Sequence, residues 1–278
     1  MENKRVTIVG AIVFVELLFL AFLFLGKKPE FLQVGNMLSP LLSLAAFTAI
    51  FRVYSKFEKG SMQRRVWLFL ALGMLCWFIG EMESLYYAAT SASIRVASVF
   101  SIGEIAWLAG YVFFSAALFF QLRYFTEAVS RKGGIVEAGV NSLKESGPAA
   151  AIAMVGSLLI AVLVIGFMLV PINNSAMIFE QKLMLFAYLL GDFILIVMSL
   201  LLLSLLVGGE LEAPFGLLAG ALTIAGLTDV TITTALLANS YIPGGALDFF
   251  SLLVYVALMA SGEIMRQKLV AAENRSER

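Results

Sequence analysis

Residues Leu183–Val207 read LMLFAYLLGDFILIVMSLLLLSLLV. A helix needs about 20 predominantly apolar residues to cross the hydrocarbon core of a bilayer. This stretch is longer than that, and its one charged residue is Asp192. It therefore predicts a transmembrane helix that carries a carboxyl group inside the membrane.

The composition of the whole chain indicates the same fold class. Of its 278 residues, 61% are hydrophobic and 14% are charged, whereas a soluble domain has roughly half apolar and a quarter charged residues. The net charge is zero, so nothing indicates a nucleic-acid partner. The absence of histidine and the single cysteine exclude histidine-based metal and haem sites and a disulfide within the chain. We predict an all-α integral membrane protein in the lipid bilayer, with no cofactor.

Seven further segments are long and apolar enough to span a bilayer, so we predict eight transmembrane helices. The first segment follows Lys4 and Arg5, as in a signal peptide. It is longer than the apolar region of a signal peptide and has no small-x-small cleavage site, so we expect a retained helix. The eight predicted spans are Val6–Leu25, Met37–Tyr54, Val66–Ala89, Phe100–Phe120, Ala149–Val170, Leu183–Val207, Phe215–Ala238 and Ala246–Met265.

Basic residues in the loops predict the orientation, because cytoplasmic loops carry an excess of lysine and arginine. With the N-terminus in the cytoplasm, fifteen of the nineteen basic residues fall in inner segments. The other four are Lys27, Lys28, Arg95 and Lys182. We therefore predict an inner (cell) membrane protein with both termini in the cytoplasm.

The ends of the two halves share a pattern. In each half a glycine lies three residues before an acid, and a second acid lies seven residues before a tyrosine. The offset between the halves is 146 residues at the first acid and 144 at the second. Coincidence among many apolar residues is the alternative to a duplication. The matched residues are Gly80, Glu83, Glu104 and Tyr111 in the first half and Gly226, Asp229, Asp248 and Tyr255 in the second.

From this pattern we predict a parallel 4+4 tandem repeat, a kind of arrangement that often places binding sites at the interface between its halves. The linker and the tail are candidate docking surfaces for a cytoplasmic signalling partner, and the alternative is that both are solvated loops. The predicted units are residues 1–125, the first four-helix unit; 126–147, the cytoplasmic linker; 148–268, the second four-helix unit; and 269–278, the cytoplasmic tail.

We single out five carboxyl groups inside the predicted spans, where each costs ~2.5–3.5 kcal/mol on insertion scales, so a functional site is the default interpretation. The predicted topology puts all five in the outer half of the bilayer, and we expect them to line an outward-facing, water-accessible pocket. Burial and mutual proximity favour the neutral form of a carboxyl, so we expect protonated groups among them. The five acids are Glu83, Glu104, Asp192, Asp229 and Asp248.

Aromatic and hydroxyl side chains lie on the same helical faces as these acids, three, four or seven residues away. Such side chains suit the walls of a pocket and cation–π contacts. The alternative is the aromatic belt of any membrane interface, with the acids forming a structural polar network. Arg95 and Lys182 are the basic candidates for neutralising the pocket. The aromatic candidates for ligand binding are Tyr87, Trp107, Tyr111, Tyr188 and Tyr255, and the sequence does not identify a metal.

Three features look similar to a known class of membrane domain: Tyr188-x-x-Gly191-Asp192 before an apolar run, the later Asp229, and Asp248…Tyr255 before the last span. Together they resemble the multi-helix membrane input (sensor) domains upstream of prokaryotic diguanylate cyclases and histidine kinases. The resemblance covers mainly residues 180–265 and, more weakly, 73–120. It implies a sensing or binding bundle. Those proteins carry a cytoplasmic output domain, whereas this chain ends about ten residues after its last predicted span, so a partner would supply the output.

We therefore predict that the chain binds a cation, a proton or a small ligand in a sensory or regulatory role, with no catalytic residue. One alternative is a proton- or cation-coupled secondary transporter. Another is an intramembrane aspartyl protease, because Gly191-Asp192 looks like the glycine–aspartate motif of that family and Asp229 supplies a second carboxyl. The Gly216-x-x-x-Gly220 motif predicts close helix packing, either inside the chain or in a homodimer.

Overall fold

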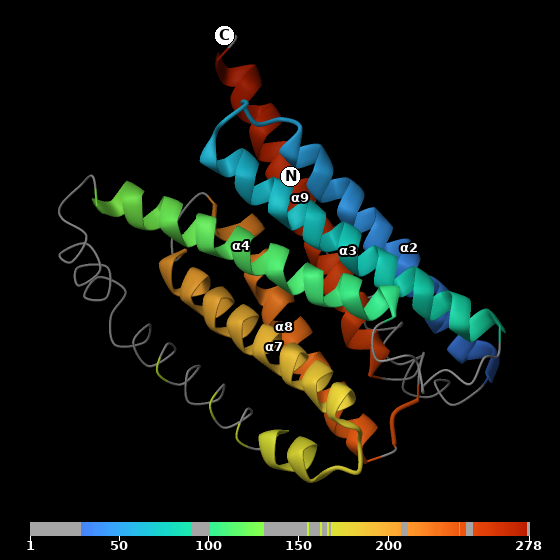
Figure 1. Ribbon diagram of the computed structural model, residues 1–278. Coiled ribbons are helices and arrows are strands. Elements are labelled where there is room, and N and C mark those ends of the chain that lie inside the picture. The colour runs from blue at the N-terminus through green and yellow to red at the C-terminus, as the bar shows by residue number, and fades with distance from the viewer. Residues whose placement is uncertain are drawn as a thin grey trace.

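The computed structural model describes residues 29–90, 101–130, 168–206, 211–238, 240–242 and 247–276, together with positions 155, 162 and 166. The first predicted span and most of the fifth lie outside these residues. The described part is helical and has no strand (Figure 1). Six of its helices are long and apolar enough to cross a membrane, which indicates a multipass membrane protein. They are α2 (Pro29–Tyr54), α3 (Met62–Thr90), α4 (Ile102–Ser130), α7 (Phe179–Leu205), α8 (Glu212–Leu237) and α9 (Asp248–Ser276).

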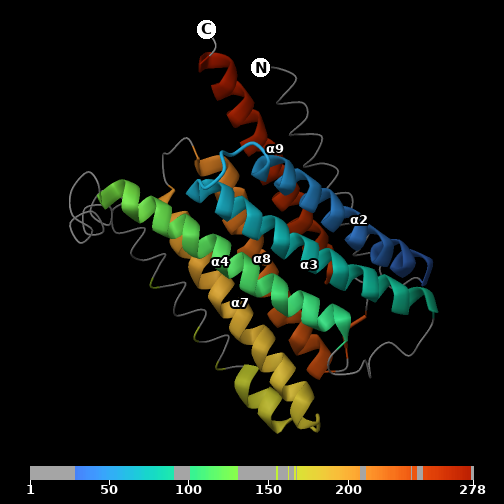
Figure 2. The same ribbon diagram turned by 45° about the horizontal axis from the view of Figure 1, so that its top comes forward.

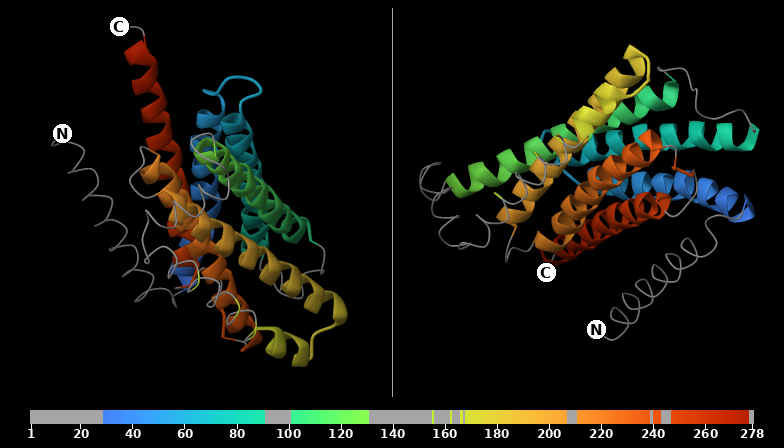
Figure 3. Two further views of the ribbon diagram at one scale, coloured as in Figure 1. Left: turned by 90° about the vertical axis from the view of Figure 1, so that its left-hand side faces the viewer. Right: turned by 90° about the horizontal axis from the view of Figure 1, so that it is seen from below.

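The six helices form a closed ring in chain order. Helix α2 packs against α3, α3 against α4, α4 against α7, α7 against α8 and α8 against α9, and α9 returns to α2. The views in Figures 2 and 3 show α9 beside α2 and α7 beside α4, so the ring closes between segments far apart in the sequence. A ring of this kind encloses an interior that all six helices can line.

Helices α3 and α4 interlock through glycines and aromatic rings. A Cβ atom built on Gly73 would lie 2.8 Å from the Phe114 ring, and one on Gly80 would lie 2.4 Å from Trp107 Nε1. A glycine of α4 likewise accommodates a ring of α3, since a Cβ on Gly110 would lie 2.4 Å from Trp77 Cδ1. Each helix therefore offers a glycine to an aromatic ring of the other, which brings the two backbones close together in lipid.

The packed core fills the half of the interior near the α2–α3 turn. Trp67 on α3, Phe114 on α4 and Phe215 on α8 are fully buried there. The rings of Trp67 and Phe215 lie 5.8 Å apart between centroids. Large side chains therefore fill this half of the ring interior.

Charged side chains gather at the end of the bundle beside this core. Lys56, in the turn after α2, lies 3.1 Å from Glu273 near the end of α9. Arg266 makes two hydrogen bonds to Glu263, at 2.9 and 2.7 Å. Exposed pairs of this kind contribute ~0–1 kcal/mol to stability. Their main significance is that they identify the polar end of the bundle.

Three helices run well beyond the spans predicted from hydropathy: α2 begins at Pro29, eight residues before the predicted start at Met37, and α4 and α9 end later than predicted. Helix α9 continues from the predicted end at Met265 through Ser276, so most of the predicted tail 269–278 is helical. Hydropathy falls after Met265, but the residues that follow, RQKLVAAENRS, are mostly good helix formers with no glycine or proline. Helix α4 likewise reaches Ser130, inside the predicted linker 126–147.

Candidate functional site

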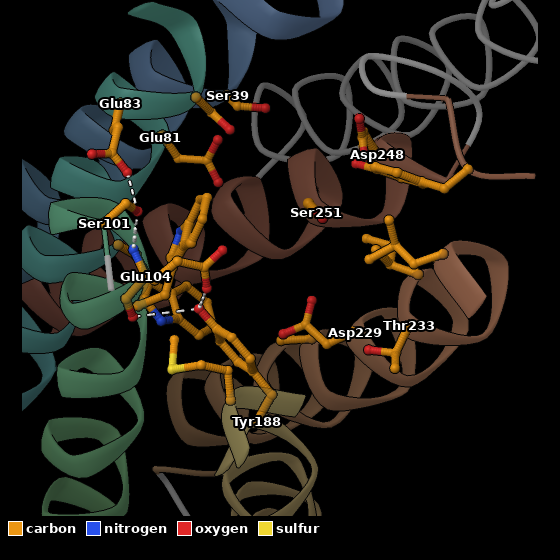
Figure 4. A pocket seen from close by; sticks show the side chains of 18 of the residues that line it. Ser39, Glu81, Glu83, Ser101, Glu104, Tyr188, Asp229, Thr233, Asp248 and Ser251 are labelled. Carbon is orange, nitrogen blue, oxygen red and sulfur yellow. Dashed lines mark hydrogen bonds between the residues drawn. The ribbon is translucent and has the colours of Figure 1, made fainter. Parts of the chain in front are cut away.

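The half of the ring interior away from the core holds a cavity of about 640 Å³. Ligand pockets for small molecules span roughly 300–1,000 Å³. Figure 4 shows the carboxyl groups of Glu81, Glu104 and Asp229 around one shared hollow. Among the described residues that line the cavity there is no lysine or arginine. The acids of this lining are Glu81, Glu83, Glu104, Asp229 and Asp248.

Most of the residues singled out from the sequence meet at this cavity. Four of the five predicted acids line it, and Asp192 lies behind the wall with 2% of its surface exposed. All five predicted aromatic residues line it as well: Tyr87, Trp107, Tyr111, Tyr188 and Tyr255. The structure thus brings together side chains from α3, α4, α7, α8 and α9.

Tyr111 on α4 joins two carboxyl groups from two other helices. Its hydroxyl lies 2.5 Å from Asp192 Oδ1 on α7 and also hydrogen-bonds with Asp229 Oδ2 on α8. The position of the ring depends on Gly191, because a Cβ atom there would lie 2.6 Å from Tyr111 Cδ1. The glycine before Asp192 therefore makes room for the tyrosine that binds the aspartate.

Glu81 is a site residue that the sequence analysis missed. Its Oε1 accepts a hydrogen bond of 2.6 Å from the Tyr255 hydroxyl, which connects α3 to α9. It met the criterion used for the other acids, a carboxylate inside an apolar span, but the comparison of the two halves selected Glu83 instead. Glu81 lies four residues after Trp77, which also lines the cavity, so the two side chains share a helical face. The other acids were selected with neighbours at such spacings, and the same pattern could have identified Glu81.

Glu83 has a structural role at the start of α4. Its Oε2 accepts hydrogen bonds from Ser101 Oγ at 2.5 Å and from the Gly103 backbone N–H at 2.8 Å. The first N–H groups of a helix have no partner inside the helix, and a carboxylate there also interacts favourably with the helix dipole. Glu83 therefore lines the cavity and also caps α4. Its Oε2 atom already accepts two hydrogen bonds from the start of that helix.

Hydroxyl groups of tyrosines also hold the remaining two acids. Tyr188 donates to Glu104 Oε2, which links α7 to α4. Tyr241, in the connection before α9, donates to Asp248 Oδ1 at 2.6 Å. Glu104 and Asp248 thus have partners that orient them, as Glu81 has in Tyr255.

The basic residues expected near the site differ in what the structure shows of them. Lys182 Nζ donates to the backbone oxygen of Asn173 at 2.7 Å and is not part of the cavity lining. Arg95 lies outside the described residues. Among the described residues, no group of three or more Asp, Glu or Cys side chains is arranged to hold a metal ion. The described carboxyl groups therefore do not form a compact metal centre.

Comparisons with known proteins add no family to these observations. No protein-family model, curated protein or solved structure matches this chain. The function therefore has to be argued from the cavity itself.

Proposed function

We propose that this chain is a multipass membrane protein that binds a cation or a small cationic ligand in the cavity, in a sensory or regulatory role. The observation that carries the proposal is the lining: acids and aromatic rings together, with no lysine or arginine among its described residues. Carboxyl groups cost free energy at membrane depth, and a cation that enters the cavity would offset that cost.

The spread of the acids favours an organic cation over a bare metal ion. The carboxyl groups come from different walls of a cavity of about 640 Å³, and the described residues hold no metal-ligand cluster. Trp77, Trp107 and Tyr87 add aromatic faces to the wall. A quaternary or primary ammonium group near such rings gains about 0.5–2 kcal/mol from cation–π attraction.

We also propose the finer architecture of the chain: eight spans in a parallel 4+4 repeat. The order of neighbours in the ring supports the repeat. If α2, α3 and α4 are exchanged with α7, α8 and α9, every neighbouring pair becomes another neighbouring pair. A two-fold axis along the membrane normal would have this effect.

The distribution of charge supports a cavity that opens to the outside of an inner membrane, with both termini in the cytoplasm. In the described part, every lysine and arginine except Lys182 lies at or toward the end with the α2–α3 turn and the C-terminal ends of α4 and α9. The cavity lies toward the other end. Cytoplasmic segments carry the excess of basic residues, so the polar end is the cytoplasmic one in this proposal, and a signalling partner would dock there.

Transport by the same acids is the alternative from another class. A secondary transporter has to open its site to both sides in turn. The core of Trp67, Phe114 and Phe215 fills the half of the ring on the proposed cytoplasmic side, which favours one-sided binding. Uptake of labelled choline by proteoliposomes, saturable and driven by a pH gradient, would reverse this preference.

Proteolysis is the third reading, and one contact disfavours it. In aspartic proteases two carboxyl groups share one proton directly. Here the Tyr111 hydroxyl hydrogen-bonds with both Asp192 and Asp229 and so lies between the two carboxyl groups. Inhibitors that mimic the transition state of aspartic proteases are expected not to bind the purified protein.

The test of ligand binding uses choline and 3,3-dimethylbutanol, which have the same shape and differ in charge. Choline, methylammonium and spermidine are added separately to the purified protein, and thermal unfolding is followed at constant ionic strength. At a concentration of 100 times Kd, a ligand stabilises the folded state by about 2.7 kcal/mol. We expect stabilisation by at least one of the ammonium compounds, none by the neutral alcohol, and its loss in Asp229→Asn.

The matched control is Glu263→Gln, because Glu263 pairs with Arg266 at the opposite end of the bundle. It should keep the full response. If none of the ammonium compounds stabilises the wild-type protein more than the neutral alcohol does, the proposal of a cation site is wrong.

A further inference from the structure

The contact between Tyr111, Asp192 and Asp229 has one hydrogen atom too few if both aspartates are ionised. A phenol has a single O–H donor, and an ionised carboxylate only accepts. The Tyr111 oxygen nevertheless lies at hydrogen-bond distance from both carboxyl groups. One of the two contacts would then bring two oxygen atoms together without a hydrogen between them.

A single additional proton resolves this. A protonated carboxyl donates to the Tyr111 oxygen, and the Tyr111 O–H donates to the other carboxylate. Each of the three groups then has a partner, and the two aspartates carry one negative charge instead of two. Hydrogen bonds arranged in a chain strengthen one another in a medium of low dielectric, and such a pair titrates as a unit.

The surroundings of the cluster do not favour a second negative charge. Four other acids line the same cavity: Glu81 and Glu83 on α3, Glu104 on α4 and Asp248 on α9. Tyr188 on α7 and Tyr255 on α9 are the neighbouring titratable hydroxyls, and the lining residues of α2 are the uncharged Asn36 and Ser39. The described lining supplies no lysine or arginine to compensate a fully ionised pair.

We propose that the Asp192–Tyr111–Asp229 cluster is a proton-binding site that holds one proton at neutral pH and releases it when a cation occupies the cavity beside Asp229. The first half of this statement stands without any ligand, and the second half rests on the proposed function.

The two aspartates of the cluster differ in their access to the cavity. This difference provides a route by which the proton can leave through Asp229. Asp192 is 2% exposed and does not line the cavity, whereas Tyr111 and Asp229 do. The proton on Asp192 passes to the Tyr111 oxygen while the Tyr111 proton passes to Asp229. One O–H bond breaks and one forms at each step, and the phenol is neutral before and after. The Asp229 proton then leaves to water in the cavity, and the carboxylate charge that remains balances the incoming cation.

The composition of the chain makes this proposal unusually accessible to measurement. The chain contains only three aspartates, Asp192, Asp229 and Asp248, and all three lie at this site. Protein made with aspartate labelled with ¹³C at the side-chain carboxyl therefore reports on these groups alone. The infrared C=O band of a protonated carboxyl differs from the bands of a carboxylate, and the label shifts it only if the protonated group is an aspartate.

In the ligand-free protein at neutral pH we expect one label-sensitive band of a protonated carboxyl. Asp192→Asn and Asp229→Asn should each abolish it, because a lone aspartate beside Tyr111 can accept the hydroxyl proton as an ionised group. Asp248→Asn should keep it. The asparagine amide can donate where the protonated carboxyl did, and thermal unfolding verifies that each variant folds. The absence of the band in the wild-type protein, or its loss only in Asp248→Asn, would overturn the proposal.

The exchange step is tested separately. The test uses whichever of choline, methylammonium and spermidine stabilises the protein most. Its addition to weakly buffered protein should remove the band and release about one proton per chain, as expected for one coupled pair. Binding without proton release would overturn the exchange step and leave the proposed function standing. A band that is present in a protein that binds none of these compounds would overturn the proposed function and leave the proton site standing.

Discussion

Tyr111 and Tyr255 make matching contacts from the two halves of the ring. Tyr111 on α4 hydrogen-bonds with Asp229 on α8, and Tyr255 on α9 donates to Glu81 on α3 at 2.6 Å. Neither pair of helices is adjacent in the ring, so both contacts cross its interior. Trp77 lies between the two tyrosines and meets each ring edge-on, at centroid distances of 6.0 and 6.3 Å. The cavity wall is therefore one connected set of aromatic and carboxyl groups.

Replacing Tyr111→Phe should destabilise the protein, because it removes the hydroxyl that satisfies two buried carboxyl groups. The loss of a partner for a buried polar group costs about 1–3 kcal/mol. The matched control is Tyr86→Phe, since Tyr86 is 63% exposed and does not line the cavity; it should change the free energy of unfolding by less than about 0.5 kcal/mol. Denaturant unfolding in detergent measures both variants, and equal effects would contradict the role given to Tyr111.

Gly191→Ala should act on the same contact from the other side. The new methyl group would lie 2.6 Å from Tyr111 Cδ1, and overpacking of this kind costs about 1–3 kcal/mol. At Gly216 a Cβ atom meets no described atom within 4 Å. Gly216→Ala should therefore be neutral or stabilise α8 by up to ~1 kcal/mol. Thermal unfolding of both variants checks this, and Gly191→Ala with wild-type stability would show that the ring of Tyr111 is not confined by α7.

Glu83→Gln and Glu81→Gln should separate a structural acid from a binding acid. Glu83 caps α4, so Glu83→Gln should lower stability by about 0.5–2 kcal/mol, the usual cost of losing a cap. Hydrogen exchange at the start of α4 should also become faster. Glu81→Gln should instead weaken the response to ammonium compounds with little change in that exchange. If Glu83→Gln alone abolishes the response, the assignment of the two roles is reversed.

Labelling of introduced cysteines should decide which end of the bundle faces the cytoplasm. The chain has one cysteine, Cys76, so Cys76→Ala gives a background without thiols. Lys59→Cys places a thiol in the exposed α2–α3 turn, and Ser240→Cys places one in the exposed connection between α8 and α9. A maleimide that does not cross membranes should label intact cells or spheroplasts at position 240 and label position 59 only after lysis. The opposite pattern would put the cavity on the cytoplasmic side.

Hydropathy alone predicted the helices of the described part closely where apolar runs end at charged or turn residues. The span predicted at Leu183–Val207 is helix Phe179–Leu205, and the one at Phe215–Ala238 is helix Glu212–Leu237. It could not predict how far α9 extends, because a helix that leaves the membrane keeps its hydrogen bonds while its hydropathy falls.

The convergence of the acids was also predictable, because burial at membrane depth is costly for each of them. Their partners were not. Asp192 and Asp229 lie 37 residues apart, and nothing local indicates that Tyr111 binds both. Glu83 lines the cavity, but the sequence does not show its contact with the Gly103 backbone, which makes it a cap of α4. Side-chain roles that depend on contacts between helices need the three-dimensional arrangement.

The interlocked hairpin of α3 and α4 also has a mechanical consequence. Aromatic rings seated on glycines cannot slide past one another without large clashes, so these two helices have to move as one rigid body. The seam between α4 and α7 has one such contact, Tyr111 on Gly191, and is otherwise joined by the hydroxyl groups of Tyr111 and Tyr188, which hydrogen-bond to carboxyl groups. If the proposed ligand changes the conformation of the protein, we expect the helices to move at the seam between α4 and α7, and α3 and α4 to move together.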